Sequence, residues 1–365
     1  MFDCFLSFYY ISLKDDHCSI GGLCFRNQNM NRIKTGVIGT GHLGRFHAKV
    51  YSQLDGAELV GVYDIDQDKA KKLAIELGTN CFSELDQLLK KIEAASLVVP
   101  TSSHFEVGKE ILESDVHLLI EKPIAQTVQQ AEALITLAKE KNLTLQVGHI
   151  ERFNPAFLAI ENLKLNPKFI ESHRLALFNP RGTDVAVVLD LMIHDIDLIL
   201  SLVKSELRDI QAASISVITE SEDIANARLT FENGTVANIT ASRISANNMR
   251  KIRFFQKNSY ISLDLLRKEA EIYRLVDLKD YSLKEEESST IIGKIPTEQI
   301  GKTILYEKPK IEDRDMLTLE ISSFLEAVRN RKKPKVTGED GKRALEVALK
   351  IIEKSSQHRK GMKEI

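Results

Sequence analysis

The sequence has no excess of charge of either sign and no long apolar run. Among 365 residues, 50 Lys and Arg side chains stand against 52 Asp and Glu side chains, so the formal net charge is -2. This balance gives no electrostatic basis for binding nucleic acid or a membrane surface. No stretch reaches the roughly 18 uninterrupted apolar residues that a spanning helix needs. We therefore expect a globular protein without nucleic acid or membrane partners, long enough for two domains.

Cysteine is also scarce, with four residues in the whole chain. Three of them, Cys4, Cys18 and Cys24, lie before the first predicted strand, and their spacing matches no common zinc pattern. The fourth, Cys81, is predicted to be a buried structural thiol. This usage is typical of a reducing cytoplasm, so we expect a cytoplasmic protein.

Residues 1–29 differ in character from the rest of the chain. Residues 5–13 are apolar enough to resemble the core of a signal peptide, but Asp3 stands where a positive charge is expected, and no convincing cleavage site follows. Met30 directly precedes the first predicted strand. We interpret residues 1–29 as an extension that is either disordered or the product of a mis-assigned start.

A short apolar strand at residues 34–38 runs into a glycine-rich turn, and a helix is predicted from Arg45 onward. The turn has the spacing G-x-G-x-x-G. The first glycine allows a tight turn, the second lets the backbone approach a pyrophosphate, and the third lets the helix pack close to the strand. The phosphates would lie on free N–H groups at the helix start. The predicted cofactor-binding turn consists of Gly39, Thr40, Gly41, His42, Leu43 and Gly44.

An acidic residue ends the second predicted strand, at residues 57–64. Asp64 follows Gly44 by about 20 residues, which is where a ribose-binding carboxylate is expected. Ile65 and Asp66 follow it, so the 2′-phosphate of NADP would meet negative charge and no counter-ion. The sequence therefore predicts NAD, in preference to NADP, as the cofactor.

The order of the predicted elements indicates an α/β fold with two domains. From residue 30 to 150, strands at 95–99, 116–120 and 143–147 alternate with helices, which predicts an N-terminal Rossmann domain with a doubly wound parallel sheet. Alternating stretches at 171–178, 210–219, 225–244 and 250–265 then predict a C-terminal α+β domain, residues 151–315, with a large and mostly antiparallel sheet.

Three further segments complete this prediction. A strong helix is expected at 185–203, and the polar stretch 280–315 is expected to form loops with short strands. Residues 316–365 are expected to form two helices that pack back on both domains, separated by a turn at 338–341.

The carboxyl ends of the predicted parallel strands carry the first candidate site residues, because ligands bind at that edge of such sheets. Lys122 ends one strand between Glu121 and Pro123, and proline fixes the backbone there. A partly desolvated lysine could stabilise an alkoxide or take up a proton, whereas an isolated lysine would be a surface residue. Thr101 and His104, in the loop after another strand, join Glu121 and Lys122 as candidate cofactor contacts.

The strong helix carries the second set of candidates. Asp190 and His194 are four residues apart and Asp197 follows three later, so they share one face of an apolar helix. A neutral imidazole is suited to removing an alcohol proton, and Asp190 could orient it or hold a substrate hydroxyl. A lone histidine in such a helix is often a core residue. We expect no metal at this position, since Lys122 in the same crevice would repel a divalent cation.

Together, the turn at 39–44, Glu121-Lys122-Pro123, Asp190 with His194, and Gly338-Glu-Asp-Gly341 resemble the Gfo/Idh/MocA family of sugar-type dehydrogenases, over essentially everything after Met30. The resemblance implies hydride transfer between a sugar or polyol carbon and nicotinamide, with Lys122, Asp190 and His194 as the catalytic and substrate-binding set. It also implies a C-terminal domain whose open sheet often makes the oligomer contact, so we expect a homo-oligomer, a dimer or tetramer.

The stretch 148–155 resembles family members that oxidise UDP-linked N-acetylhexosamines at C3, which implies UDP-N-acetylglucosamine or a related UDP-sugar as substrate. Asn154 in this stretch is a candidate substrate contact. Arg152 and Arg181 could meet a diphosphate by charge-assisted contacts, or could be structural ion pairs. His149 stands where many relatives carry a different polar residue, and its role is open.

Two alternatives remain at this point. The same chemistry could act on a free polyol or hexose, such as an inositol. The chain could also be a non-catalytic NAD-sensing regulator, since such proteins share the fold, although they can dispense with the lysine and histidine that this sequence has.

Overall fold

The computed structural model describes residues 32–179, 185–277, 289–297 and 302–361. The extension at 1–29 and Arg181 therefore lie outside the described residues. From Arg32 onward the chain forms one compact unit. No helix in the described residues is long and apolar enough to cross a membrane.

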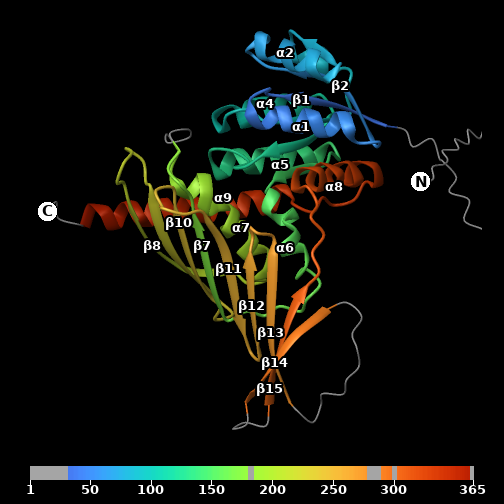
Figure 1. The fold of residues 1–365 in the computed structure, drawn as a ribbon. Coiled ribbons are helices and arrows are strands. Elements are labelled where there is room, and N and C mark those ends of the chain that lie inside the picture. The colour runs from blue at the N-terminus through green and yellow to red at the C-terminus, as the bar shows by residue number, and fades with distance from the viewer. Residues whose placement is uncertain (1–31, 180–184, 278–288, 298–301, 362–365) are drawn as a thin grey trace, which may run out of the picture. The chain divides into compact units, whose positions relative to one another are not determined.

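The first sheet has six parallel strands in the order β3-β2-β1-β4-β5-β6. Its strands are β1 (Ile33–Ile38), β2 (Ala57–Tyr63), β3 (Asn80–Phe82), β4 (Ala94–Leu97), β5 (His117–Glu121) and β6 (Leu145–Gly148). The connecting helices are α1 (His42–Gln53), α2 (Gln67–Leu77), α3 (Leu85–Leu89), α4 (His104–Glu113) and α5 (Val128–Glu140), with the 3-10 turn η1 (Thr101–Ser103) before α4. This confirms the predicted Rossmann sheet (Figure 1).

The second sheet has nine strands in the order β14-β15-β13-β12-β11-β7-β10-β9-β8. Its strands are β7 (Phe169–Leu175), β8 (Leu207–Ile215), β9 (Ile224–Phe231), β10 (Val236–Ser242), β11 (Met249–Gln256), β12 (Ser259–Asp264), β13 (Glu269–Asp277), β14 (Ser289–Thr297) and β15 (Lys302–Pro309). Among the described strands of this second sheet, only β7 and β10 pair in parallel, so the mostly antiparallel sheet is also confirmed.

The polar stretch after residue 280 differs from its prediction, because β14 and β15 are full strands of nine and eight residues. In β15 the burial alternates, with Thr303, Leu305 and Glu307 buried. The buried Glu307 carboxylate accepts a hydrogen bond from Arg274 on β13. A charge paired across strands hides the apolar alternation that would otherwise identify a strand.

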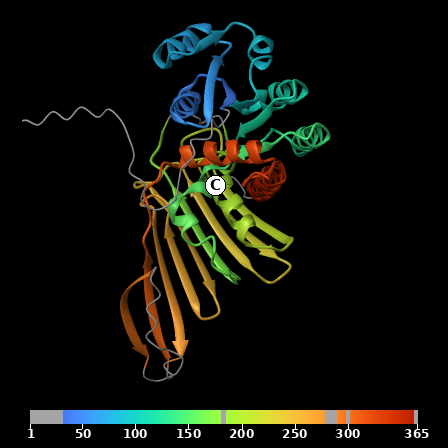
Figure 2. The same cartoon turned by 90° about the vertical axis from the view of Figure 1, so that its right-hand side faces the viewer.

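Helices α7 (Ile193–Leu202), α8 (Met316–Asn330) and α9 (Gly338–Gly361) complete the described core. Figure 2 shows α8 and α9, in red, between the Rossmann strands and the large sheet. Helix α8 contacts α1, and α9 contacts α5, α7 and β8. The π-helical turn η3 (Val188–Met192) leads into α7, so the predicted helix at 185–203 starts later and irregularly.

The segment 338–341 is the first turn of α9 and not a separate turn before it. Asp340 Oδ2 accepts hydrogen bonds from Thr337 N at 2.9 Å and Thr337 Oγ1 at 2.7 Å, and Asp340 N donates to Thr337 Oγ1. This reciprocal arrangement caps the helix. Gly341 is required by packing, since a Cβ would lie 2.6 Å from Val147.

Candidate active site

The glycine-rich turn has the geometry that a bound pyrophosphate requires. Gly39 adopts a φ of +93°, and its N–H donates to Tyr63 O at 2.8 Å. A Cβ at Gly44 would lie 1.9 Å from Gly39 O, so the third glycine is fixed by packing of helix against turn. At Gly41 a Cβ would meet nothing within 4 Å, which leaves the backbone open on the ligand side. The α1 N-terminus directly follows this opening.

Asp64 is held across the turn at the end of β2. Its Oδ2 accepts hydrogen bonds from Thr40 N at 2.6 Å and Thr40 Oγ1 at 2.9 Å, while Oδ1 accepts from Asp66 N at 2.9 Å. Oδ2 already accepts two hydrogen bonds, whereas Oδ1 accepts one and has a further lone pair for a ribose hydroxyl. The turn and this carboxylate therefore fit NAD.

Glu121 lies at the carboxyl end of β5 in a buried chain of hydrogen bonds. Its Oε1 is 3.2 Å from His47 Nε2, His47 Nδ1 is 3.1 Å from Ser96 Oγ, and Ser96 Oγ is 2.9 Å from the Tyr51 hydroxyl. Burial acts to raise the pKa of Glu121, but His47 and Lys122 outweigh it and the pKa is lowered. The sequence analysis missed His47, Ser96 and Tyr51, because only the fold brings them to Glu121.

The absence of a side chain at Gly148 makes room for this carboxylate. A Cβ there, at the end of β6, would lie 2.9 Å from Glu121 Oε1.

The loop after β4 places His104 and Thr101 differently. His104 is buried, with Nδ1 2.8 Å from Pro123 O and Nε2 2.9 Å from Val99 O. Burial lowers the pKa of His104, and a neutral ring has one N–H for these two carbonyls. Its ring therefore braces the loop that follows Lys122. Thr101 is half-buried in η1, and contact of either residue with the cofactor stays a prediction.

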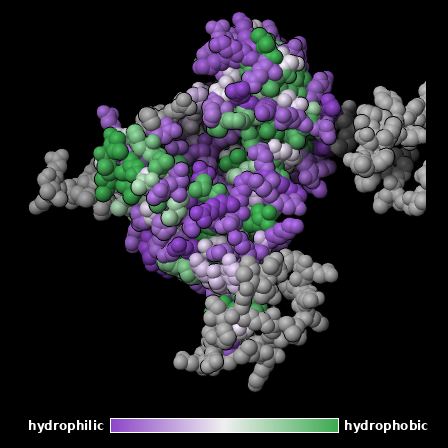
Figure 3. All heavy atoms as spheres, in the orientation of Figure 1, coloured by the Kyte–Doolittle hydropathy of each residue, from purple (hydrophilic) through white to green (hydrophobic). Residues whose placement is uncertain are grey.

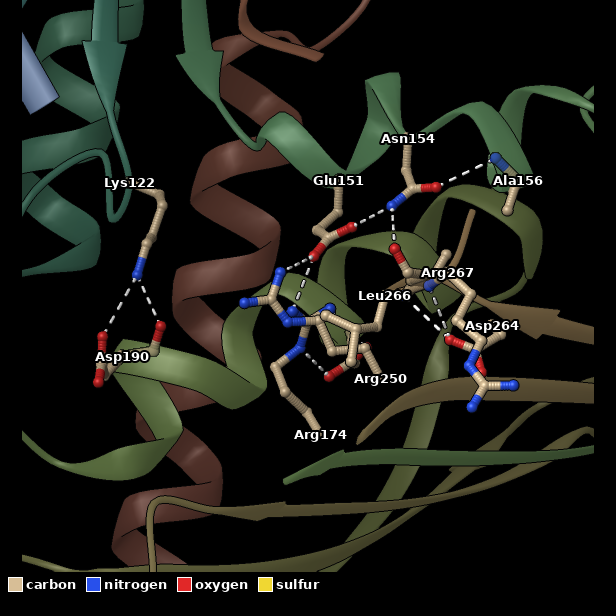
Figure 4. Close-up of polar contacts among 12 residues, drawn as sticks. Lys122, Glu151, Asn154, Ala156, Arg174, Asp190, Arg250, Asp264, Leu266 and Arg267 are labelled. Atoms are coloured by element: carbon tan, nitrogen blue, oxygen red, sulfur yellow. Dashed lines mark hydrogen bonds and ion pairs between the residues drawn. The ribbon is translucent and has the colours of Figure 1, made fainter. Parts of the chain in front are cut away.

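Lys122 reaches from β5 to the π-helical turn of the second domain. Its Nζ donates to Asp190 O at 2.6 Å and lies 3.8 Å from Asp190 Oδ1 (Figure 4). Burial lowers the pKa of Lys122, although Asp190 and Glu121 act in the opposite direction. Asp190 Oδ2 also lies 4.0 Å from Arg243 Nη2, so this carboxylate is held between two cations.

His194 begins the next turn and lines the same cavity as Lys122. Its side chain is half-buried, and Nδ1 is buried without a partner in the described part of the chain. Burial, followed by repulsion from Lys122 and Arg174, holds the pKa of His194 well below 6.5, so the ring is neutral at neutral pH. The cavity has a volume of about 610 Å³, within the usual range for small-ligand sites. It is also lined by Leu43, Phe46, His47, Glu121, Gly148 and Thr318.

The structure therefore brings Lys122, Asp190 and His194 together, as the spacing predicts. Arg152 and Asn154 instead face the protein interior. Arg152 binds Asp197 through two hydrogen bonds, of 2.6 and 2.9 Å, which favours the structural ion pair over diphosphate binding. Asn154 Nδ2 donates to Glu151 and to Leu265 O, and its Oδ1 accepts from the start of α6 (Pro155–Leu158).

Arg174 on β7 is the centre of a buried ion-pair network that the sequence did not predict. Its guanidinium donates to Glu151 Oε1 at 2.8 Å and to Asp195 at 2.7 and 3.1 Å, and all three residues are buried (Figure 4). The only sequence signal for its burial is the alternation along the strand, in which Ile170, Ser172 and Arg174 occupy the inward-facing positions. Among the described residues, no group of three or more His, Cys, Asp or Glu side chains could hold a metal ion.

A Rossmann sheet with an open glycine turn, facing a lysine and a histidine in one cavity, defines a dinucleotide-dependent oxidoreductase. The Gfo/Idh/MocA model, described as an oxidoreductase family with an NAD-binding Rossmann fold, matches residues 33–149, and the model of its C-terminal domain matches 173–260. The chain belongs to this family. The family resemblance, the enzyme class and NAD as the cofactor are thereby confirmed.

Individual relatives cover nearly the whole chain. UDP-N-acetylglucosamine 3-dehydrogenase of Acidithiobacillus ferrooxidans is 38% identical over 88% of this chain and 97% of its own. A solved structure of that enzyme has a TM-score of 0.80 at 36% identity, covering 90% and 99% of the two chains. scyllo-Inositol 2-dehydrogenase (NAD(+)) of Bacillus subtilis is 26% identical over 87% and 93%.

Proposed function

We propose that this protein oxidises the 3-hydroxyl of UDP-N-acetylglucosamine, or of a related UDP-sugar, to a ketone with NAD. The observation that carries the proposal is the shared cavity of Lys122 and His194 beside Glu121, in a chain similar over most of its length to a UDP-N-acetylglucosamine 3-dehydrogenase. Residues 39–44 and Asp64 would hold the cofactor, with Thr101, His104 and Glu121 toward its nicotinamide end. NAD, when bound, accepts the hydride that leaves the sugar carbon.

The protein's own residues handle the proton and the developing negative charge. The neutral ring of His194 removes the hydroxyl proton, since its pKa lies well below 6.5 and the free base predominates. Lys122 stabilises the alkoxide by a charge-assisted hydrogen bond. Its Nζ donates to Asp190 O, and in this proposal Asp190 Oδ1, which lies 3.8 Å from Nζ, accepts a hydrogen bond from a second hydroxyl.

The test measures NADH formation with UDP-N-acetylglucosamine, free N-acetylglucosamine and myo-inositol. Lys122→Met and His194→Gln should each lower kcat by about 10²- to 10⁴-fold while NAD still binds. The control Lys90→Met changes an exposed lysine at a helix end and should leave both kcat and NAD binding unchanged. Near-normal turnover in both site variants contradicts the roles of Lys122 and His194 in the reaction.

Isotopic substitution locates the reacting carbon. UDP-N-acetylglucosamine deuterated at C3 should show a primary isotope effect and transfer its label to the reduced cofactor, whereas the C4-deuterated sugar should not. Oxidation of myo-inositol with no turnover of any UDP-sugar contradicts the substrate proposal and favours the free-polyol alternative.

We also propose that the enzyme is a cytoplasmic homo-oligomer. A row of half-buried aromatic rings crosses the face of the large sheet opposite α7, with successive centroids 5.9, 5.0, 5.3 and 4.9 Å apart. The row consists of Phe169, Phe255, Tyr260, Tyr273 and Tyr306. Analytical ultracentrifugation should give a dimer or tetramer that Tyr273→Glu dissociates and Tyr273→Phe preserves.

A second apolar region lies at the end of β8. Ile215, Val217 and Ile218 have exposed side chains, and Figure 3 shows apolar spheres gathered on this part of the surface.

The proposal that the protein is cytoplasmic rests on its cysteine usage. Among the described residues Cys81 is a free thiol, half-buried and not fully buried as predicted.

A further inference from the structure

His149 is a buried histidine whose ring nitrogens have no partner among the residues that the structure describes. It follows β6 directly, its exposed fraction is 0%, and neither Nδ1 nor Nε2 makes a hydrogen bond within the described part of the chain. Buried side-chain nitrogens are paired in the large majority of proteins, and an exception calls for an explanation. Packing alone does not supply one, because an apolar side chain would fill the same space without unpaired polar atoms.

The ring of His149 is next to the ring of His194, the proposed catalytic base, but does not line the cavity. The centroids of His149 and His194 are 6.4 Å apart and the rings are perpendicular. His194 lines the cavity and His149 does not. Since Nδ1 of His194 is the buried, unpartnered nitrogen, Nε2 is the one available to substrate, and Nδ1 lies on the protein side.

No carboxylate of the same helix is free to serve His194 at Nδ1. Asp190 lies by Lys122 and Arg243, Asp195 is bound by Arg174, and Asp197 is bound by Arg152. In many enzymes a carboxylate orients the base and stabilises its cation. In this protein each carboxylate near the ring already belongs to a cation, which leaves the neutral ring of His149.

The surrounding charges differ for the two rings. The charges that act on His194 are all positive and lower its pKa, namely those of Lys122, Arg174, Arg250 and a protonated His149. Those that act on His149 include both signs, namely Asp197, Glu121, Arg152 and Lys122. Burial is the largest cause that lowers the pKa of His149, as it is for His194, but only at His149 do carboxylates, those of Asp197 and Glu121, act in the opposite direction. Beyond Asp197, Arg152 Nη2 lies 4.0 Å from Asp340, whose side chain is 37% exposed.

We propose that His149 is a positioning residue that receives the substrate proton from His194. This inference rests on the proposed oxidation. The hydroxyl O–H bond breaks and its proton moves to His194 Nε2, while the hydride leaves the carbon for NAD with the electron pair of the C–H bond. The two rings share no hydrogen bond in the structure and must approach one another before the proton on His194 Nδ1 passes to a ring nitrogen of His149. His149 releases this proton to water on the side of Asp197 and Asp340, and exchange of the His194 tautomer from Nε2–H to Nδ1–H restores the base for the next turnover. One proton is released in each turnover.

The first test is the kinetics of His149→Gln, which keeps a polar side chain but cannot carry a proton at neutral pH. We expect kcat to fall by about 10- to 100-fold, below the full effect of a general base, with KM changed less than about twofold. The rate of the variant should also rise with buffer concentration at constant pH, because external bases must accept the proton. A rate independent of buffer, or a change in KM alone, contradicts the relay.

A double-mutant cycle separates the relay from a structural role. If His149 acts through His194, adding His149→Gln to His194→Gln should cause no further loss, whereas effects that multiply would show an independent role and overturn the inference. Imidazole should restore His149→Ala in proportion to its free-base fraction, and thiazole, of similar size but a weak base, should not. Equal rescue by both would show that the ring only fills space.

Failure of the inference is distinct from failure of the proposed function. If the wild-type protein does not oxidise a UDP-sugar, the substrate proposal fails, and the same cycle with the sugar or polyol that it does oxidise still tests His149. If His149→Gln does not fold, as judged by thermal melting, His149→Asn and the imidazole rescue of His149→Ala decide the question.

Discussion

Replacing Arg174 by methionine should destabilise the protein strongly, because it leaves two carboxylates buried without their cation. Arg174 makes the three hydrogen bonds that hold Glu151 and Asp195. Glu151 keeps Asn154 and a distant Arg250, 3.5 Å away, whereas Asp195 keeps no other ion pair among the described residues. Breaking a buried pair by removing one partner costs roughly 3–5 kcal/mol, and we expect a loss in that range.

Urea unfolding, compared at equal m-values, measures this loss. Arg253→Met is the matched control, since Arg253 pairs with Glu171 at 3.4 Å while 39% of its side chain is exposed. An exposed pair of this kind contributes about 0–1 kcal/mol. The triple variant Glu151→Gln, Arg174→Met, Asp195→Asn should recover most of the stability, because no buried charge remains unpaired.

The same substitution should shift the pH profile of the reaction. Arg174 is a cation that lowers the pKa values of both Lys122 and His194. Without it both pKa values rise, so the acid limb of activity should move to higher pH in Arg174→Met.

The stability prediction has its own contradicting outcome. If Arg174→Met lowers the free energy of unfolding by less than about 1 kcal/mol, or unfolds like Arg253→Met, the buried network does not hold the domain as argued.

Three further predictions concern the turn, a buried acid and the base. Gly44→Ala should lower the melting temperature, because its Cβ would lie 1.9 Å from Gly39 O. Gly41→Ala should melt normally but bind NAD more weakly, because its Cβ would meet no protein atom within 4 Å. Unchanged NAD affinity of Gly41→Ala contradicts the placement of the pyrophosphate. Burial, followed by Glu121, raises the pKa of Glu320 well above 4.5, so the stability it contributes is present below 4.5 and lost as pH rises through the folded value. Glu320→Gln should therefore gain melting temperature over the wild type as pH rises, and a constant difference refutes this. Because the pKa of His194 is lowered, the acid limb of kcat/KM should lie well below 6.5, and a limb at or above 6.5 excludes His194 as the base.

The Rossmann half was predictable because its signals are local. Glycine spacing, apolar runs and an acid at a strand end report directly on backbone geometry. Strand β3 escaped prediction because it has three residues and begins with the exposed Asn80. Strand β15 and the first turn of α9 escaped because Glu307 and Asp340 complete their structures through polar partners, and such pairing leaves no apolar pattern.

The candidate site was also predictable only where its sequence signals are local. Lys122 follows from a strand end and His194 from helical spacing, so the sequence could place both at one crevice. For Arg152 the sequence left two interpretations equal, because a guanidinium near a sugar site suits a diphosphate or a buried carboxylate equally well. Only the fold shows Asp197 opposite it, with both oxygens occupied.

The distribution of these ion pairs also explains how a base can work where cations prevail. The carboxylates of η3 and α7 could each have raised the pKa of His194, but Asp195 and Asp197 are committed to Arg174 and Arg152, and Asp190 lies between Lys122 and Arg243. His194 is therefore kept neutral and cannot retain a proton. Such a base must pass its proton on before the next turnover, which is the role that we propose for its buried neighbour His149.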